Sequence, residues 1–403
     1  MPSPTGCRHD FRRASPVKGL SLGVHQIPVP VVVAPMAGVT NRAFRRLARE
    51  YGPGVYVSEM VTARALLERN SETLRMCAFD DDESPRSLQL YGTDPTTVAA
   101  AVRMVIEEDL ADHIDLNMGC PVPKVTRKGG GAALPWKIDL FAAIITASVR
   151  TAQDASKRAD RSEVPVTVKM RMGIDVDHLT YLDAATAAAE AGVAWVALHA
   201  RTAAQLYGGH ADRTAIGTLV THLRQSNVAV LGNGDIWTAA DALTMVADTS
   251  CDGVVVGRGC LGRPWLSGQL AAAFSGAPIP ADPGLAEVAD IMRRHCGYLV
   301  DILGAERGPR DFRKHVSWYL KGFSVPHHIR VGLAHVGSET ELSTLLRQID
   351  LNQDFPAAAG RNPRGRTSGG RPVSLPQGWL DSRYSDPSER AAVAAGESQF
   401  SGG

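Results

Sequence analysis

One cysteine has neighbours that favour a reactive thiol over a packing residue. Cys120 stands between a glycine and a proline, directly after the apolar run "HIDLN" and shortly before the three glycines of "RKGGGAAL". Structural cysteines are usually surrounded by apolar side chains, whereas this one lies where the backbone turns and where a ligand could approach. A positioned thiol can act as a general acid. The alternatives are a nucleophilic cysteine and an inert loop cysteine.

Polar and small residues recur at the ends of the other apolar runs. In chain order they are Pro35, Met36, Ala37, Gln89, Asn117, Lys169, Arg171, His199, Asn233, Gly234, Asp235, Gly257 and Arg258. The runs themselves are short and rich in β-branched residues, which is typical of buried strands. Active-site residues of a barrel gather at the C-terminal ends of its strands. We therefore expect these side chains to face one site.

The last two of these runs are followed by "GNGD" and "GRG", which suit a phosphate group. Glycines let the backbone approach an anion, and Arg258 adds a fixed positive charge. Lys169 could stabilise the negative charge of a reduced flavin ring, and Gln89 could bind the polar edge of that ring. The chain has no P-loop and no G-x-G-x-x-G motif, so nicotinamide would be a visiting reductant. The residues favour FMN, and another sugar phosphate stays open.

The elements that position these residues alternate regularly. Eight apolar runs are separated by amphipathic, Ala- and Leu-rich segments, which predicts an α/β protein with a closed (β/α)₈ barrel, over residues 21–275. Helical periodicity then continues alone and predicts a C-terminal helical domain over 285–351. Residues 1–20 lack a pattern and predict a flexible tail. Residues 352–403 are rich in Pro, Gly, Ser and Arg and predict a disordered tail.

Composition excludes several classes of protein. The chain has 403 residues, 44% of them hydrophobic, and a formal net charge of +1, which argues against a protein that coats polyanions. No apolar run is long enough to span a membrane, and no signal peptide is evident. None of the six cysteines forms a C-x-x-C pair, so we expect no bound metal. These features predict a soluble, cytoplasmic protein, which we expect to be a monomer.

A family resemblance rests on several motifs in order. The segments "APMAGVTNRAFR", "LQLYG", "IDLNMGCPVPKV", "GGGAAL", "VTVKMRMG", "LHARTAAQLYGGHAD", "GNGDI" and "GVVVGRGCLGRPW" resemble those of tRNA-dihydrouridine synthases. The segment "FRKHVSWYLKG" is similar to the helical domain of the bacterial members. The resemblance implies an FMN-dependent barrel that reduces uridines of tRNA to 5,6-dihydrouridine with NADPH or NADH, and a helical domain that binds tRNA.

The same resemblance assigns roles to the residues named above. Cys120 would be the proton donor, and Asn117 and Arg171 would lie near the target base. The FMN ligands would be Pro35, Met36, Ala37, Gln89, Lys169, His199, Asn233, Gly234, Asp235, Gly257 and Arg258. The three glycines 129–131 would form a mobile loop that closes over the base.

Two further expectations concern the helical domain. Basic residues there, including Arg313, Lys314 and Lys321, would contact phosphates of the tRNA, whereas Trp318 and Tyr319 are expected in the core. Two other functions stay open. One is a flavin barrel acting on a free pyrimidine, similar to dihydroorotate dehydrogenase. The other is a tRNA-binding protein without catalysis.

Overall fold

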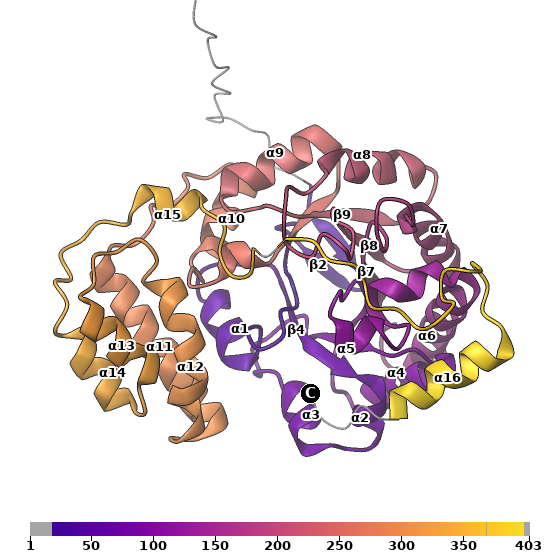
Figure 1. The fold of residues 1–403 in the computed structure, drawn as a ribbon, viewed down its shortest axis with the longest axis horizontal. Helices are drawn as coiled ribbons and strands as arrows, with labels where there is room; N and C mark the ends of the chain where they lie inside the picture. The colour runs from indigo at the N-terminus through magenta and orange to yellow at the C-terminus, as the bar shows by residue number, and fades with distance from the viewer. Residues whose placement is uncertain (1–17, 368, 399–403) are drawn as a thin grey trace, which may run out of the picture.

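Eight short parallel strands pair in sequence order and close into a barrel, as the sequence predicted. The computed structural model describes residues 18–398 except residue 368 (Figure 1). The barrel strands are β3 (Val31–Val33), β4 (Val55–Thr62), β5 (Ser87–Tyr91), β6 (His113–Met118), β7 (Val166–Arg171), β8 (Trp195–His199), β9 (Ala229–Asn233) and β10 (Gly253–Val256). Strand β10 pairs with β3 and closes the ring, with Val254 opposite Val31.

Helices cover the outside of this barrel. They are α1 (Arg42–Arg49), α2 (Ala63–Leu67), α3 (Ser71–Met76), α4 (Pro95–Glu107), α5 (Pro123–Thr126), α6 (Ile138–Arg158), α7 (Tyr181–Ala191), α8 (Arg213–His222), α9 (Ala239–Thr249) and α10 (Leu266–Phe274). Local sequence starts and stops them. Asp94 caps α4 by accepting a hydrogen bond from the amide of Thr97, and α7 ends at Gly192, whose φ of 90° suits glycine.

Alternate residues of each strand face the helices and the barrel interior. In β6, Ile114 and Leu116 are buried in the main apolar core that the strands share with the helices. The intervening His113 and Asp115 instead bond side chains of the neighbouring strands inside the barrel. Because strand side chains alternate in this way, successive inward positions form layers. These layers are stacked along the barrel axis, from the N-terminal ends of the strands to the mouth at their C-terminal ends.

A two-stranded hairpin closes the N-terminal end of the barrel. Strands β1 (Leu20–Leu22) and β2 (His25–Ile27) pair antiparallel. Their apolar side chains pack against inward residues such as Val32 and Trp195. The sequence predicted a flexible tail up to residue 20, but Leu20 is buried in this hairpin. The rest of that predicted tail, residues 1–17, lies outside the described residues.

Four helices follow the barrel and share a second apolar core. They are α11 (Leu285–Leu303), α12 (Arg307–Tyr319), α13 (His327–His335) and α14 (Glu339–Leu346). Figure 1 shows them to one side of the barrel, next to α1. Ala43 and Leu47 of α1 belong to this second core, together with Phe312 of α12. Helix α1 therefore joins the helical domain to the barrel.

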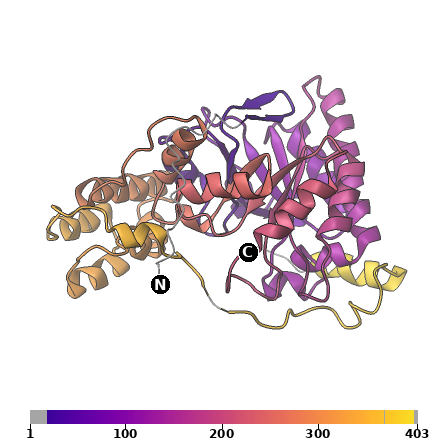
Figure 2. The same ribbon diagram turned by 90° about the horizontal axis from the view of Figure 1, so that it is seen from above.

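The C-terminal segment differs from the disordered tail that its composition predicted. It contains α15 (Ala357–Arg361) and α16 (Pro387–Ser398), and the chain between them runs along the barrel (Figure 2). Trp379 and Arg364 are both buried in this segment. The prediction does not match the structure over residues 352–367 and 369–398. A few widely spaced anchors hold this segment in place, and such anchors leave no periodic pattern in the sequence.

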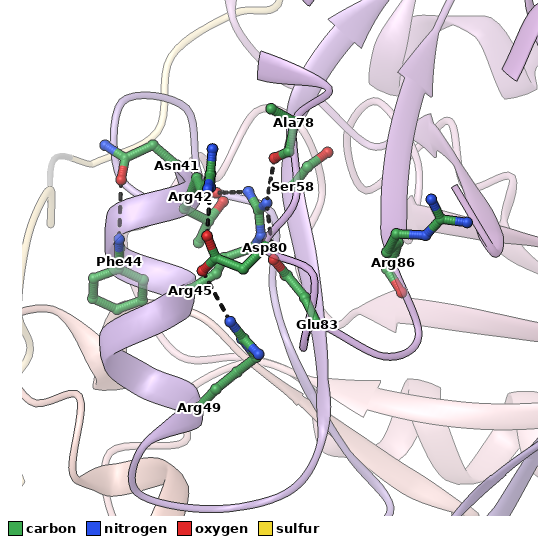
Figure 3. Close-up of polar contacts among 12 residues, drawn as sticks. Asn41, Arg42, Phe44, Arg45, Arg49, Ser58, Ala78, Asp80, Glu83 and Arg86 are labelled. Atoms are coloured by element: carbon green, nitrogen blue, oxygen red, sulfur yellow. Dashed lines mark hydrogen bonds and ion pairs between the residues drawn. The ribbon is translucent and has the colours of Figure 1, made fainter. Parts of the chain in front are cut away.

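A cluster of ion pairs fastens α1 to the loop that precedes β5. Arg42 and Arg49 bond the two oxygens of the Asp80 carboxylate at 2.5 and 3.0 Å. Arg45 Nε donates to Glu83 Oε1 at 2.6 Å, and both side chains are only 1% exposed. Figure 3 shows these arginines, one turn apart on the helix, pointing at the loop. The Arg45–Glu83 pair is thus a buried ion pair between α1 and the loop that precedes β5.

Candidate active site

A cavity of about 490 Å³ opens at the C-terminal mouth of the barrel. Every site residue predicted from the sequence lines it, namely Pro35, Met36, Ala37, Gln89, Asn117, Cys120, Lys169, Arg171, His199, Asn233, Gly234, Asp235, Gly257 and Arg258. Many of these residues occupy the last inward position of their strand or the loop just beyond it. The structure therefore gathers the predicted residues at one place. It does not by itself assign their roles.

The backbone around Cys120 is held by one side chain. Asn117 Oδ1 accepts hydrogen bonds from the amides of Gly119 and Cys120 at 3.1 and 3.0 Å. The carbonyl of Cys120 accepts from the amide of Ala132 at 3.0 Å. The cysteine is half-buried, and burial raises the pKa of its thiol. Asn117 therefore fixes the position of a thiol that stays protonated at neutral pH.

A chain of buried polar groups supports Asn117 from below. Asn117 Nδ2 donates to Gln89 Oε1 at 2.8 Å, and Gln89 Nε2 donates to Asp115 Oδ2 at 2.7 Å. Thr167 donates to the other Asp115 oxygen at 2.7 Å. Burial raises the pKa of Asp115, while the hydrogen bonds from Gln89 and Thr167 oppose the rise. Sequence reasoning missed Asp115, although its place two residues before Asn117 on an inward position of the strand was a usable signal.

Two cations of β7 face the same cavity. Burial, followed by the repulsion of nearby Arg171, lowers the pKa of the Lys169 ammonium to about 8. Burial also lowers the pKa of Arg171 to about 10. Arg171 donates to the carbonyls of Gly119 at 3.1 Å and of Thr202 and Leu206 at 2.8 Å. Arg171 thus ties the cysteine turn to the loop after β8, and both cations favour an anion or a polar ring in the cavity.

The far end of the cavity is built from the loops after β9 and β10. Arg201 Nη2 contacts both oxygens of Asp235 at 2.8 Å, and Arg258 Nη2 lies 3.4 Å from Asp235 Oδ1. Gly234 has a φ of 136°, and a Cβ there would lie 2.5 Å from the Ala211 side chain. Only glycine fits this turn. Asp235 therefore orients two arginines beside a backbone that an anion can approach closely.

Aromatic side chains that were not among the predicted site residues complete the wall. Tyr207, Trp237 and Trp318 all line the cavity. The Arg258 guanidinium lies over the Tyr207 and Trp237 rings, 4.9 and 5.0 Å from their centres. Trp318 was expected in the core. It is half-buried, packs against the barrel core and also lines the mouth from α12. Its neighbour Tyr319 is buried in the helical domain, as expected.

His199 at the end of β8 is held neutral. Its side chain is buried among Lys169, Arg171 and other cations, and burial is the main reason that its pKa lies well below the usual value. The side chain also faces the Tyr207 ring, with 6.4 Å between the ring centres. At neutral pH, His199 can therefore offer the cavity one N–H donor and one nitrogen acceptor.

The glycine loop expected to be mobile is closely packed. A Cβ on Gly130 would lie 2.2 Å from the Tyr91 hydroxyl, and one on Gly131 would lie 2.4 Å from the Cys120 carbonyl. A Cβ on Gly129 would lie 2.6 Å from the Trp379 ring. These glycines allow close contact with the cysteine turn and with the C-terminal segment. The expectation of a loop that closes over a base does not match this packing.

The basic residues of the helical domain are mostly engaged within the protein. Lys314 pairs with Asp311 at 2.8 Å, and Arg313 donates to the carbonyls of His335 and Val336. Lys321 donates to the carbonyl of Pro363. Arg293, Arg294, Arg307 and Arg310 form ion pairs with Asp290, Glu50, Glu72 and Glu306. A cation that is paired in this way remains positive, but its charge is partly compensated.

Two other features of the described chain bear on function. No helix among residues 18–398, residue 368 apart, is long and apolar enough to cross a membrane. In the same part of the chain, no group of three or more His, Cys, Asp and Glu side chains could hold a metal ion. The described cysteines other than Cys120, namely Cys77, Cys251, Cys260 and Cys296, are buried.

Fold and site together define a barrel enzyme whose mouth has a cavity lined by cationic side chains and a positioned thiol. The family described as "Dihydrouridine synthase (Dus)" matches residues 32–357. The chain therefore belongs to the dihydrouridine synthase family, as its motifs predicted.

The curated relatives agree with this assignment. The chain is 51% identical over 399 residues to a protein named probable tRNA-dihydrouridine synthase in Mycobacterium tuberculosis H37Rv, covering 97% of this chain and 99% of the relative. It is 50% identical over 398 residues to a protein of the same name in Mycobacterium leprae, covering 92% and 100%. It is 37% identical over 300 residues to tRNA-dihydrouridine synthase B of Pseudomonas aeruginosa, covering 74% and 86%.

Proposed function

We propose that this protein is a tRNA-dihydrouridine synthase that reduces the 5,6 double bond of uridine in tRNA, with FMN bound in the barrel mouth. NADPH, or NADH, is the reductant that visits the site. One observation carries the proposal: the thiol of Cys120, kept protonated by burial, lies at a cationic cavity at the mouth of a barrel of the dihydrouridine synthase family.

The residues present fit FMN. A cavity of about 490 Å³ lies within the range of small-molecule sites. Pro35, Met36 and Ala37 would form an apolar wall against the ring. Gln89, Lys169, His199 and Asn233 would bind its polar edge, and Gly234, Asp235, Gly257 and Arg258 would surround the phosphate. When bound, reduced FMN supplies the hydride that adds to carbon 6 of the uracil ring.

Cys120 supplies the proton in this mechanism. As the hydride adds at carbon 6, the electron pair of the double bond moves toward carbon 5 and the adjacent carbonyl. The Cys120 thiol protonates carbon 5 and becomes a thiolate. The nearby charges of Lys169 and Arg171 favour that thiolate, in opposition to the larger effect of burial. Burial therefore keeps the proton on sulfur before reaction, while Lys169 and Arg171 reduce the cost of the thiolate that remains afterwards.

Asn117 and Arg171 act near the base in this proposal. The carboxamide of Asn117 is already bonded to the amides of Gly119 and Cys120 and to Gln89. We therefore assign Asn117 the role of positioning the thiol, and Arg171 that of holding the cysteine turn against the loop after β8. Both residues line the cavity, so both also form the wall against which the uracil would stack.

The helical domain over 285–351 would bind the tRNA while the uridine leaves its stack. Extrusion of a base costs a few kcal/mol, which contacts to the surrounding RNA must offset. Trp318 brings an aromatic side chain of this domain to the cavity itself. The domain is therefore placed beside the site at which the base must enter. We expect a monomer in the cytoplasm.

The test is the oxidation of pre-reduced protein by tRNA. The purified protein should carry FMN that is released on denaturation, and NADPH should bleach its flavin absorbance. Unmodified tRNA should then restore that absorbance and gain dihydrouridine. Protein that contains no flavin and cannot be reconstituted with FMN would contradict the cofactor. Oxidation by a free pyrimidine but not by tRNA would point instead to an enzyme of free nucleobases.

A further inference from the structure

A segment beyond the family match borders the active site. The match ends at residue 357. Residues 361–367 and 369–386, here called the C-terminal strap, run from the last residue of α15 to the start of α16. Figures 1 and 2 show this strap passing from the helical domain across the barrel to the side of α6. Gly365 and Arg366 of the strap line the cavity that contains Cys120. The strap is therefore part of the mouth.

The beginning of the strap is fastened between the two domains. The buried guanidinium of Arg364 donates to the carbonyls of Leu261 and Ala359 at 3.2 Å and to the carbonyl of Trp318. The carbonyl of Arg366 accepts from Arg258 Nη1 at 2.8 Å. The backbone on both sides of Gly365 is thus held against the phosphate end of the cavity.

The remainder of the strap is fastened along the rim of the barrel. The amide of Arg371 donates to the carbonyl of Ala204, in the loop after β8, at 3.0 Å. Trp379 Nε1 donates to the carbonyl of Ala133, next to the glycine loop, at 3.0 Å. Arg383 donates to the carbonyl of Trp136 at 3.1 Å. These anchors use backbone groups and a few buried side chains. Val373, Leu375 and Leu380 also pack against the core, whereas residues 365–367 and 369–372 are exposed.

The first part of the strap carries charged residues of one sign only. Between residues 355 and 380 the chain has four arginines and no acidic residue. One of the four, Arg364, is the buried anchor. Arg361, Arg366 and Arg371 are exposed, and their guanidinium groups have no ion-pair or hydrogen-bond partner within residues 18–367 and 369–398. The helical domain differs, because cations there such as Arg293 and Arg294 pair with carboxylates.

We propose that the C-terminal strap is an RNA-binding element whose exposed arginines contact the backbone phosphates of the tRNA around the uridine in the cavity. This inference rests on the proposed function. Guanidinium groups bind phosphate oxygens with strong, charge-assisted hydrogen bonds. Phosphate contacts fix the register of a nucleic acid without reading its sequence. Arg366 lines the cavity, and Arg361 and Arg371 lie on the same anchored segment to either side of it, where the flanking nucleotides would pass.

The experiment compares two variants with the same loss of charge. The strap variant is R361Q/R366Q/R371Q. The control, R103Q/R150Q/R224Q, removes three exposed arginines on or beside the outer helices α4, α6 and α8. Affinity for unmodified tRNA is measured from 50 to 200 mM salt. Each lost phosphate contact lowers the salt slope by about 0.7 to 0.9. The affinity advantage of wild type over the strap variant should therefore shrink roughly 20- to 40-fold across that range.

The possible outcomes separate this inference from the proposed function. We expect the control to keep the wild-type slope and both variants to melt at the wild-type temperature. FMN is added to saturation, because Arg366 lines the cavity. Equal slopes for the strap variant and the control would overturn the inference. So would tighter tRNA binding by the strap variant, which would show that the strap blocks the entrance. If wild type binds tRNA but tRNA does not oxidise its reduced flavin, the proposed function fails, while the affinities still decide the role of the strap.

Discussion

The two ends of the barrel differ in chemistry more than in size. A hollow of about 840 Å³ lies near the closed end, beside the hairpin, whereas the cavity at the mouth measures about 490 Å³. The charged residues of the larger hollow are compensated. Arg49 bonds Asp80 and Asp82 at 3.0 Å, and Glu50 accepts hydrogen bonds from Arg294 and Tyr298. Volume alone would therefore have pointed to the wrong end.

The mouth has buried, crowded cations, which the closed end lacks within the described residues. Lys169, Arg171 and Arg258 crowd together there, and burial lowers the pKa of each. Such crowding is unfavourable until a ligand supplies opposite charge or polar partners. The closed end instead consists of apolar side chains and paired polar ones. Substitutions at the mouth should therefore change turnover and ligand affinity, and substitutions toward the closed end should change the free energy of unfolding.

The largest effect is expected at the mouth, from Cys120→Ala. The variant should bind FMN and be reduced by NADPH, because the thiol is needed only for the proton that reaches carbon 5. Oxidation of the pre-reduced variant by tRNA in a single turnover should slow roughly 100- to 10,000-fold, which is the usual contribution of a general acid. Cys120→Ser should be similarly slow, since a hydroxyl is a far weaker acid. A wild-type rate in Cys120→Ala would show that another group donates the proton.

In the barrel wall, Arg45→Met should mainly lower stability. It leaves Glu83 buried without its partner, and removal of one member of a buried ion pair destabilises by about 3 to 5 kcal/mol. Denaturant unfolding measures the change. Arg158→Met is the matched control, because the Arg158–Glu107 pair is about half exposed and its loss should change stability by about 1 kcal/mol or less. Equal losses in the two variants would contradict the distinction between buried and exposed pairs.

Arg258→Ala tests the phosphate end of the mouth. A hydrogen bond to a charged group contributes about 1.5 to 3 kcal/mol, so the FMN dissociation constant should rise roughly 10- to 100-fold. Ultrafiltration or flavin fluorescence measures the released cofactor. Arg224→Ala, which removes an exposed arginine far from the cavity, should retain FMN as wild type does. Unchanged FMN affinity in Arg258→Ala would place the phosphate elsewhere.

The effect that is smallest per step of the measurement concerns pH and a histidine toward the closed end. Burial lowers the pKa of His113 to about 3, while its ring bonds Ser87 and Thr167 at 3.0 and 2.8 Å. Its contribution to stability is complete above the unfolded pKa of about 6.5. Below that pH His113 binds a proton in the unfolded state but not in the folded state. Stability should then fall by about 1.4 kcal/mol per pH unit for this residue, down to pH 3.

The variant His113→Gln isolates that effect. Denaturant unfolding between pH 7 and pH 5 should show a smaller fall in stability for the variant than for wild type, whatever the stability of the variant at pH 7. The difference in slope is the contribution of His113, because glutamine does not titrate in this range. Identical pH slopes would show that the folded protein accommodates a proton on His113.

The order of strands and the residues of the site could be predicted from sequence for one physical reason. Runs such as "VPVTVKM" are apolar because a parallel strand covered on both faces has no solvent-exposed side. Parallel strands of a closed barrel all end at the same rim. Lys169 and Asn233 therefore needed only their positions at the ends of such runs to be placed together. Cys120 could be placed in the same site because it lies just beyond the end of β6.

Tertiary structure alone decided the rest, because those features depend on contacts between residues far apart in the chain. Trp379 packs on Gly129 and bonds Ala133 across some 246 residues, so composition suggested disorder where the structure has an anchored strap. Trp318 reaches the cavity only because α12 docks beside the barrel. Local sequence determines which way a side chain points along its own strand or helix. It does not determine what distant segment will meet that side chain.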